Sequence, residues 1–172
     1  MIERYQYPEI EKIWNDQNKF DTWKLVEQKY LETLEESNIS PSGIAEAVEQ
    51  TEVLKDEVYK REKITNHDLA SFVDVLQSKI SDNSNWIHYG LTSSDVVDTA
   101  NSLLIKQSLS ITIELLDELL IQIEAKAKQE MNTPIVGRTH GVFAETTFLG
   151  NIFGNWHQEI KRNKERLEEC IK

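Results

Sequence analysis

The amino-acid sequence predicts an all-α protein, with an N-terminal helical domain followed by the first long helices of a central helical bundle. Only six glycines and three prolines occur among the 172 residues. Apolar residues recur mostly at intervals of three and four, which is the spacing of one helix face. Residues 95–131 contain neither glycine nor proline, so one uninterrupted helix is expected there. These observations favour helices over strands along the chain.

Several short helices are predicted within residues 1–93. One follows Pro8, and the next carries an apolar stripe made of Phe20, Trp23, Val26, Tyr30 and Leu34. Ser40 and Pro41 are expected to be the N-cap and the first residue of a helix that continues to about residue 62. A further helix is expected after the tripeptide Asn66-His67-Asp68. We expect these helices to form one domain.

Residues 94–172 are predicted to begin the central bundle. At 1.5 Å per residue, the uninterrupted helix is about 50 Å long, and its apolar positions lie on more than one face. Such a helix needs neighbours on several sides, as in a large bundle or an oligomer core. This domain is therefore expected to self-associate.

The last helix is predicted to begin at about Glu145 and to run to the end of the sequence. The segment Val142–Phe148, VFAETTF, is interpreted as the start of that helix. Gly150 and Gly154 are one helical turn apart, and small residues at this spacing allow another helix to come close. The preceding segment, MNTPIVGRTHG, is expected to be a bend between helices that includes Gly137 and Gly141.

The composition excludes several classes of partner. Thirty acidic and nineteen basic residues give a formal net charge of −11, and such a surface repels the phosphates of nucleic acids. The longest apolar runs are interrupted by acidic residues and are too short to span a bilayer, so no membrane partner is expected. The first residues carry no secretory signal. The single cysteine, Cys170, is typical of the reducing cytoplasm.

Three of the four histidines lie at predicted breaks between helices, and each allows two interpretations. His67 in NHD is either part of a helix cap or a binding residue. The segment Thr92-Ser93-Ser94-Asp95, which follows His88, either only caps the long helix or holds a ligand. The loop GRTHG, with His140, is either a simple turn or presents a proton donor. Three such breaks in a helical protein favour one shared site, and histidine suits proton transfer near neutral pH. No pair of histidines has zinc-ligand spacing, so no metal is expected.

Four segments occur in a fixed order and carry more specific patterns. They are MIERYQYPEIEKIWNDQNKF, TNHDLASFV, WIHYGLTSSDVVDTA and GRTHG. Together they resemble the N-terminal part of the adenylosuccinate lyases, a family of the fumarase/aspartase superfamily. The third segment is the most specific, and the fourth is shared widely across the superfamily. The resemblance covers nearly all 172 residues and implies a fumarase/aspartase-like helical bundle.

The resemblance also implies a reaction. The family cleaves adenylosuccinate to AMP and fumarate, and SAICAR to AICAR and fumarate, by β-elimination without a metal or organic cofactor. It implies that His140 is the general acid and that His67 and His88 belong to the catalytic site. The implied substrate-binding residues are Arg4, Tyr5, Asn66, His67, Asp68, Thr92, Ser93 and Thr139. Arg4 and Tyr5 are assigned to the substrate phosphate, and Thr92 and Ser93 to a succinyl carboxylate.

The family assembles each active site from three subunits of a homotetramer, and its catalytic serine loop has no counterpart in these residues. The resemblance therefore implies a truncated lyase that is inactive alone. Phe143 stands where relatives carry a polar residue. Two alternatives stay open, namely another fumarate-releasing lyase of the superfamily and a non-catalytic helical oligomerisation module.

Overall fold

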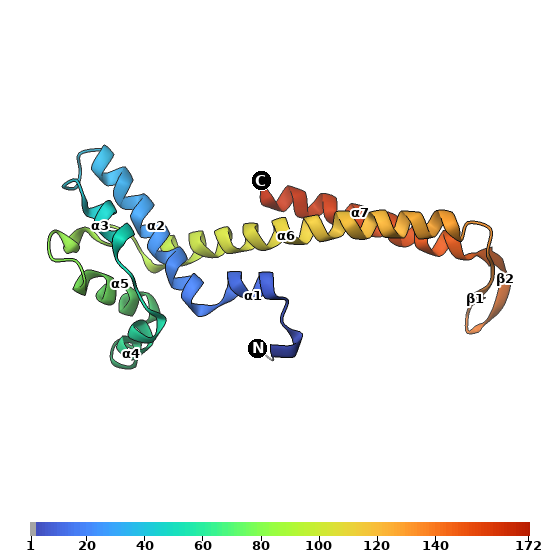
Figure 1. The fold of residues 1–172 in the computed structure, drawn as a ribbon, viewed down its shortest axis with the longest axis horizontal. Helices are drawn as coiled ribbons and strands as arrows, with labels where there is room; N and C mark the ends of the chain where they lie inside the picture. The colour runs from blue at the N-terminus through green and yellow to red at the C-terminus, as the bar shows by residue number, and fades with distance from the viewer. Residues whose placement is uncertain (1–2) are drawn as a thin grey trace. The chain divides into compact units, whose positions relative to one another are not determined.

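A computed structural model describes residues 3–172 and confirms the all-α fold class, with one short two-stranded sheet as the exception (Figure 1). The elements in chain order are η1 (Glu3–Tyr5), α1 (Pro8–Trp14), α2 (Asp16–Glu36), α3 (Ile44–Gln50), α4 (Lys55–Thr65), α5 (Asp68–Ser78), η2 (Ser84–Trp86), α6 (Ser93–Gln129), β1 (Pro134–Thr139), β2 (Val142–Phe148) and α7 (Leu149–Ile171). The chain forms two compact units, which we call unit 1 (residues 1–107) and unit 2 (residues 108–172). The predicted domain boundary at residues 93 and 94 stays a prediction.

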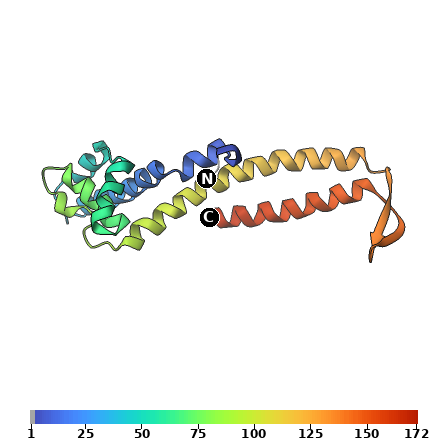
Figure 2. The ribbon, with the colours of Figure 1, turned by 90° about the horizontal axis from the view of Figure 1, so that it is seen from below.

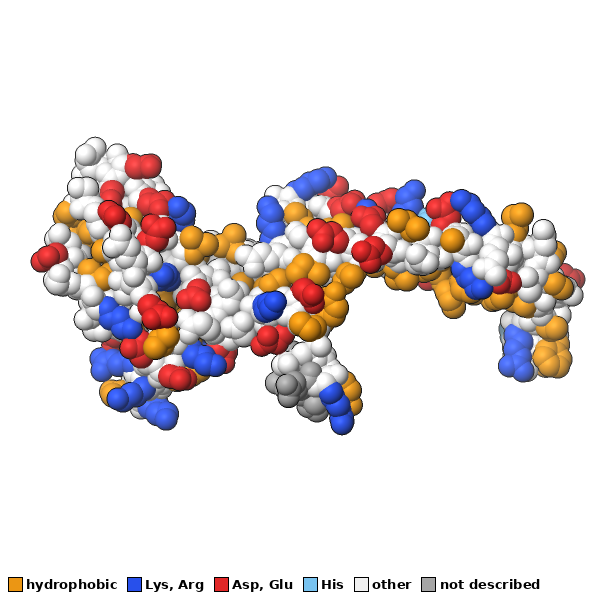
Figure 3. All heavy atoms as spheres, in the orientation of Figure 1, with side chains coloured by type: hydrophobic (Ala, Val, Ile, Leu, Met, Phe, Trp, Pro, Cys, Tyr) orange, Lys and Arg blue, Asp and Glu red, His pale blue; other side chains and the backbone are white. Residues whose placement is uncertain are grey.

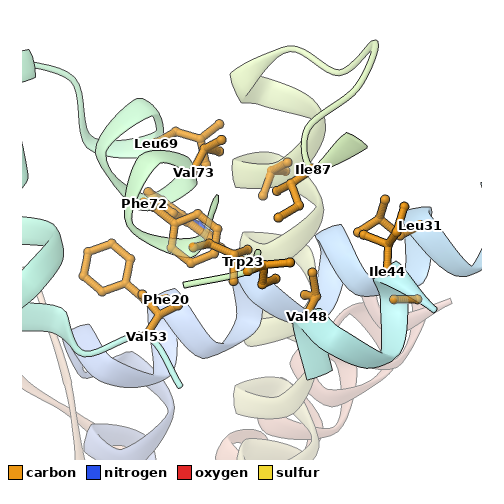
Figure 4. Packing of buried hydrophobic residues seen from close by; sticks show 14 of the residues in the cluster. Phe20, Trp23, Leu31, Ile44, Val48, Val53, Leu69, Phe72, Val73 and Ile87 are labelled. Carbon is orange, nitrogen blue, oxygen red and sulfur yellow. The ribbon is translucent and has the colours of Figure 1, made fainter. Parts of the chain in front are cut away.

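Unit 1 has a hydrophobic core built around three aromatic rings. Phe20 and Trp23 of α2 meet edge to face, with 5.2 Å between their ring centroids, and Phe72 of α5 stacks on Phe20 at 6.1 Å. The three rings point toward one another in Figure 4, and each is 2% exposed or less. Aliphatic residues of α3, α4, α5 and the start of α6 complete the cluster. This core fixes the connections between helices that carry the candidate site.

The helix predicted from Pro41 to about residue 62 is in fact two helices, α3 and α4. The chain is extended at Thr51 and Leu54, and Val53 between them is buried. A new helix then starts where the Glu57 carboxylate accepts the backbone N–H of Leu54 at 3.0 Å. Burial of Val53 therefore interrupts the helical periodicity. The predicted N-cap was also wrong, since Gly43 occupies that position.

Unit 2 consists of the second part of α6, the two strands and α7. In both ribbon views α7 runs back along α6 (Figures 1 and 2), and Lys164 Nζ of α7 lies 2.5 Å from Asp117 Oδ1 of α6. The helices lie close together at Gly150, where an added Cβ would be 2.7 Å from the carbonyl oxygen of Ala127. The predicted close approach therefore holds at Gly150. It does not hold at Gly154, where an added Cβ would have no neighbour within 4 Å.

Most apolar side chains of unit 2 remain accessible to solvent. Figure 3 shows hydrophobic side chains along its helices. Exposed examples are Leu115, Leu119, Ile121, Phe143, Ile152 and Trp156. Over residues 3–172, no helix is both long enough and apolar enough to span a membrane.

The segment Val142–Phe148 was predicted to begin the last helix, and this prediction was wrong. It forms β2, which pairs antiparallel with β1. Thr139 faces Val142 across the ladder, so His140 and Gly141 make a two-residue turn. Both have positive φ, +51° and +77°, as a type I′ turn requires. The two strands together contain six β-branched residues, namely Ile135, Val136, Thr139, Val142, Thr146 and Thr147, and branched side chains favour strands because they pack well on a pleated surface.

Candidate functional site

His67 lies at the junction of α4 and α5. Asn66 ends α4 in the left-handed conformation, with a φ of +54°, and His67 is the N-cap of α5. The His67 ring nitrogen Nδ1 accepts the backbone N–H of Ala70 at 3.4 Å and lies 3.4 Å from Asp68 Oδ1. The capping interpretation is therefore correct for His67. Because about half of each side chain of His67 and Asp68 is exposed, both also have surface left for a ligand.

The hydroxyl groups of Ser71 and Thr65 form hydrogen bonds with the main chain at this junction. Ser71 is fully buried and donates to the backbone carbonyl of His67 at 2.7 Å, and its Oγ lies 2.5 Å from Thr65 Oγ1. Thr65 in turn accepts the backbone N–H of His67 at 3.2 Å. These bonds fix the main chain on both sides of the imidazole. The sequence interpretation missed both residues, although a hydroxyl on the apolar face of α5 was a usable signal.

His88 is held by a buried carboxylate from α2. The Nδ1 atom of His88 lies 2.6 Å from Glu27 Oε1, and the backbone N–H of His88 donates to Glu27 Oε2 at 3.0 Å. The Glu27 side chain is 0% exposed, whereas that of His88 is 21% exposed. Burial raises the pKa of Glu27 above its usual range, and the hydrogen bonds from His88 oppose that rise. Glu27 is a site residue that the sequence interpretation missed.

The turn that carries His88 is fixed by further contacts within unit 1. Gln77 of α5 donates to the backbone carbonyl of Ile87 at 3.3 Å, and Ile87 is buried in the core. The rings of Trp86 and Tyr89 meet with 4.6 Å between their centroids. His88 itself has a φ of +64°, a left-handed conformation. The main chain that carries the His88 imidazole is therefore fixed by these contacts.

Thr92 and Ser93 lie where α6 begins. Asp95 accepts the backbone N–H of Thr92 at 2.8 Å, and its own N–H donates to the Thr92 carbonyl at 3.0 Å. Asp95 thus supplies the acidic half of a capping box, which agrees with the capping interpretation. Thr92 is exposed and Ser93 is partly exposed, so their hydroxyls sit at a helix N-terminus, where anions are favoured.

Arg4 and Tyr5 belong to the short helix η1. The Arg4 guanidinium lies 4.9 Å from the centre of the Tyr5 ring, and both side chains are exposed. A cation over an aromatic face is attracted by the ring electrons. The two residues therefore form a small positively charged surface of unit 1.

Thr139 and His140 are the candidate site residues that lie in unit 2. His140 occupies the tip of the β1–β2 hairpin, and both side chains are exposed. Nearby, the Arg138 guanidinium lies 5.3 Å from the centre of the Phe143 ring. Phe143 is 75% exposed, so the hairpin presents an imidazole, a cation and an aromatic ring to its surroundings. The other candidate residues all lie in unit 1.

Metal binding was not expected from the sequence. Within residues 3–172, no three His, Cys, Asp or Glu side chains are grouped so that they could hold a metal ion.

Comparison with known proteins places the chain in a family. The family model described as Lyase matches residues 3–172. The chain belongs to this lyase family. Lyases of this family named adenylosuccinate lyase occur in Thermotoga maritima and Bacillus subtilis, and each is 39% identical to the chain over 99% of its residues. The chain spans 40% of the length of either relative.

Two solved enzyme structures share the fold of the chain. A fumarate lyase from Mesorhizobium sp. BNC1 superposes with a TM-score of 0.86 over 94% of the chain and 39% of that protein, at 21% identity. The β-carboxy-cis,cis-muconate cycloisomerase from Acinetobacter calcoaceticus sp. ADP1 also gives a TM-score of 0.86, over 95% of the chain and 40% of that protein, at 18% identity. At these identities the likenesses show that the chain shares the fold of the two enzymes over nearly all of its residues.

Proposed function

We propose that the chain contributes the N-terminal residues of an adenylosuccinate lyase active site, in a protein that cleaves adenylosuccinate to AMP and fumarate and SAICAR to AICAR and fumarate. The observation that carries this proposal is the 39% identity to two proteins named adenylosuccinate lyase along 99% of the chain. The reaction is a β-elimination: a base removes a proton from the succinyl carbon, the carbon–nitrogen bond breaks, and the freed electron pairs form the double bond of fumarate and the amine.

His140 is the proposed general acid that protonates the departing nitrogen, with Thr139 beside it. Three properties support this role. The imidazole lies at the tip of a hairpin, its side chain is exposed to solvent, and histidine exchanges protons near neutral pH. The turn that presents it is tight, since His140 and Gly141 both have left-handed backbones. Such a turn limits the directions in which the imidazole can point.

The substrate is proposed to bind mainly through unit 1. His67, Asn66 and Asp68 would contact the nucleotide, and the main chain at His67 is fixed by hydrogen bonds with the hydroxyls of Ser71 and Thr65. Thr92 and Ser93 would hold a succinyl carboxylate, which the N-terminus of α6 favours electrostatically. Arg4 and Tyr5 would meet the phosphate, whose negative charge a guanidinium attracts. His88 is the remaining residue proposed for the catalytic site, beside His140 and His67. No cofactor is needed for this chemistry.

The protein is further proposed to act as a homotetramer in the cytoplasm, with each active site built from more than one subunit. Support comes from the exposed apolar residues Leu115, Leu119 and Ile121 on α6, since contiguous exposed apolar side chains favour association in water. A polypeptide limited to residues 1–172 is expected to show no turnover. Detectable lyase activity of that polypeptide would contradict this expectation.

The substitution His140→Asn tests the proposed acid. Asparagine followed by glycine is the preferred pair for a type I′ turn, so this variant keeps the hairpin and removes only the imidazole. In the complete gene product that carries these residues, we expect kcat for adenylosuccinate cleavage to fall by about 10²–10⁴-fold, with an unchanged circular dichroism spectrum. His157→Asn, in the middle of α7, is the matched control and should retain kcat.

Two outcomes would contradict the proposal in different ways. Near-normal turnover by the His140→Asn variant would remove His140 from the acid role. Absence of activity in the wild-type protein on both adenylosuccinate and SAICAR would reject the substrate class. Release of fumarate from another succinyl compound would then favour a different lyase of the same fold.

A further inference from the structure

Glu27 occupies a position where a carboxylate is energetically unfavourable. It lies on α2 between Trp23 and Leu31, at helical spacing on the buried face, and its side chain is 0% exposed. Among the described residues, it is the acidic side chain that the core encloses completely. An ionised carboxylate in such surroundings needs hydrogen-bond partners to offset lost hydration. Both oxygens of Glu27 find such partners on a single residue, His88.

We propose that Glu27 is the positioning residue of His88, which it fixes in the Nδ1–H form so that Nε2 is the proton-accepting atom offered to the substrate. This inference rests on the proposed function, because it assumes that His88 belongs to the active site.

The main-chain contact determines which atoms of Glu27 and His88 donate and which accept. The backbone N–H of His88 is a donor only, so Glu27 Oε2, 3.0 Å away, must accept. An ionised carboxylate has two acceptor oxygens and no donor. The second oxygen, Oε1, must therefore also accept, and the atom 2.6 Å from it, His88 Nδ1, must carry the proton. In the neutral ring, Nε2 is then unprotonated.

The same geometry fixes the direction of the ring. Two bonds from one buried carboxylate hold the backbone and the side chain of His88 together, and the left-handed φ of +64° at His88 sets how the side chain leaves the main chain. The side chain retains 21% exposure although Nδ1 is engaged with a fully buried group. Nδ1 of the ring is thus held by Glu27, while part of the His88 side chain stays exposed to solvent.

The substitution Glu27→Gln exchanges the donor and acceptor roles at His88 Nδ1 with almost no change in side-chain shape. The glutamine amide has one acceptor oxygen and one NH₂ donor. Because the backbone N–H of His88 still needs an acceptor, the amide oxygen must face it and the NH₂ must face Nδ1. Nδ1 then accepts, and the proton of the neutral ring moves to Nε2. The variant therefore presents a donor where the wild-type protein presents an acceptor.

Nitrogen NMR of the ¹⁵N-histidine-labelled complete gene product measures the tautomer without relying on catalysis. In the wild-type protein we expect neutral His88, assigned by its loss in His88→Asn, to carry its proton on Nδ1. In Glu27→Gln we expect the proton on Nε2. The control Glu36→Gln, at an exposed position near the end of α2, should leave the wild-type tautomer. A wild-type His88 with the proton on Nε2 overturns the proposal, as does an unchanged tautomer in folded Glu27→Gln.

Kinetics provide a second reading. Reversal of a catalytic histidine tautomer costs up to about 10⁴-fold in kcat. We expect kcat of Glu27→Gln to fall by about 100-fold or more, with KM changed by less than about threefold. Equal kcat in Glu27→Gln and Glu36→Gln would overturn the positioning role. If the wild-type protein cleaves neither substrate, the proposed function fails, whereas the tautomer measurement still decides how Glu27 acts on His88.

Discussion

Unit 1 and unit 2 differ in where their apolar side chains go. Unit 1 encloses Phe20, Trp23 and Phe72 in a core made by its own helices. In unit 2, Gly150 is the one buried residue among residues 108–172, and side chains such as Leu119 are exposed. Because helices in water are stabilised mostly by packing of an apolar face, unit 1 contains its own source of stability. The helices of unit 2 need a further surface to cover theirs.

The two units also hold their histidines differently. In unit 1, His67 and His88 are tied to buried groups, Ser71 and Glu27 respectively. In unit 2, His140 is held only through the tight turn of an exposed hairpin. In the proposed function, unit 1 would therefore supply binding residues on a fixed main chain, whereas unit 2 would supply the proton donor at the tip of a hairpin.

The largest expected difference between the units concerns loss of an aromatic ring. Phe72→Ala should lower the free energy of unfolding by about 3–5 kcal/mol, because Phe72 is fully buried and the cavity cannot close. The matched change Phe143→Ala, at a 75% exposed ring, should cost less than about 0.5 kcal/mol. Urea unfolding followed by circular dichroism measures both. Similar costs for the two variants would show that a partner surface covers the hairpin.

The next effect compares two glycines of α7. Gly150→Ala should destabilise the chain by about 1–3 kcal/mol, because the new Cβ would lie 2.7 Å from backbone atoms of Ala127 and Met131. Gly154→Ala meets no atom within 4 Å and should stabilise the helix by about 0.5–1 kcal/mol. Thermal unfolding of the two variants checks this difference in sign. Destabilisation by Gly154→Ala would indicate another helix packed there.

The smallest effect is a pH dependence of opposite sign in the two units. Burial raises the pKa of Glu27 above its ordinary value of 4.5, so the stability that its protonated form contributes is present below that value and is lost as pH rises through the raised pKa. Wild-type protein should therefore lose stability relative to Glu27→Gln as pH rises from below 4.5 through the raised pKa of Glu27. Urea unfolding at several pH values measures the slope of the unfolding free energy against pH for both proteins.

Glu124 of unit 2 is the control for that slope. A hydrogen bond from Lys128 lowers the pKa of Glu124, so its contribution is present above the ordinary value and is lost as pH falls through the lowered pKa. Wild-type protein should lose stability relative to Glu124→Gln toward acidic pH. Slopes of the same sign for the two variants would contradict the contrast between a buried and an exposed carboxylate.

Helical periodicity was sufficient to predict the long elements. The helix expected over residues 95–131 is α6, Ser93–Gln129, because nothing within it disrupts the repeat. Periodicity failed where burial of a single side chain mattered more, as at Val53 between α3 and α4. It also failed at residues 134–148, where β-branched residues and a two-residue turn make a hairpin. The pairing of two strands depends on contacts across the turn, which a helical pattern cannot represent.

The candidate histidines were predictable from their positions at breaks between helices, but the carboxylate that supports His88 was not. The apolar stripe of α2 was predicted through Val26 and Tyr30, one position before Glu27 and Leu31, which are the buried residues. A glutamate beside that stripe therefore resembled an ordinary surface charge. Its role depends on His88, 61 residues further along the chain, and only the folded structure brings the two together.

The left-handed backbones have a consequence for how tolerant the chain is to substitution. Within residues 3–172, the non-glycine residues with positive φ are Asn38, Asn66, Asn83, His88 and His140. A comprehensive substitution library scored for protein abundance should accept asparagine and glycine at both histidines, since these residues adopt the conformation most easily. The same library scored for growth that depends on the lyase should reject them. Positions where the two scores separate in this way would mark imidazole chemistry independently of any enzyme assay.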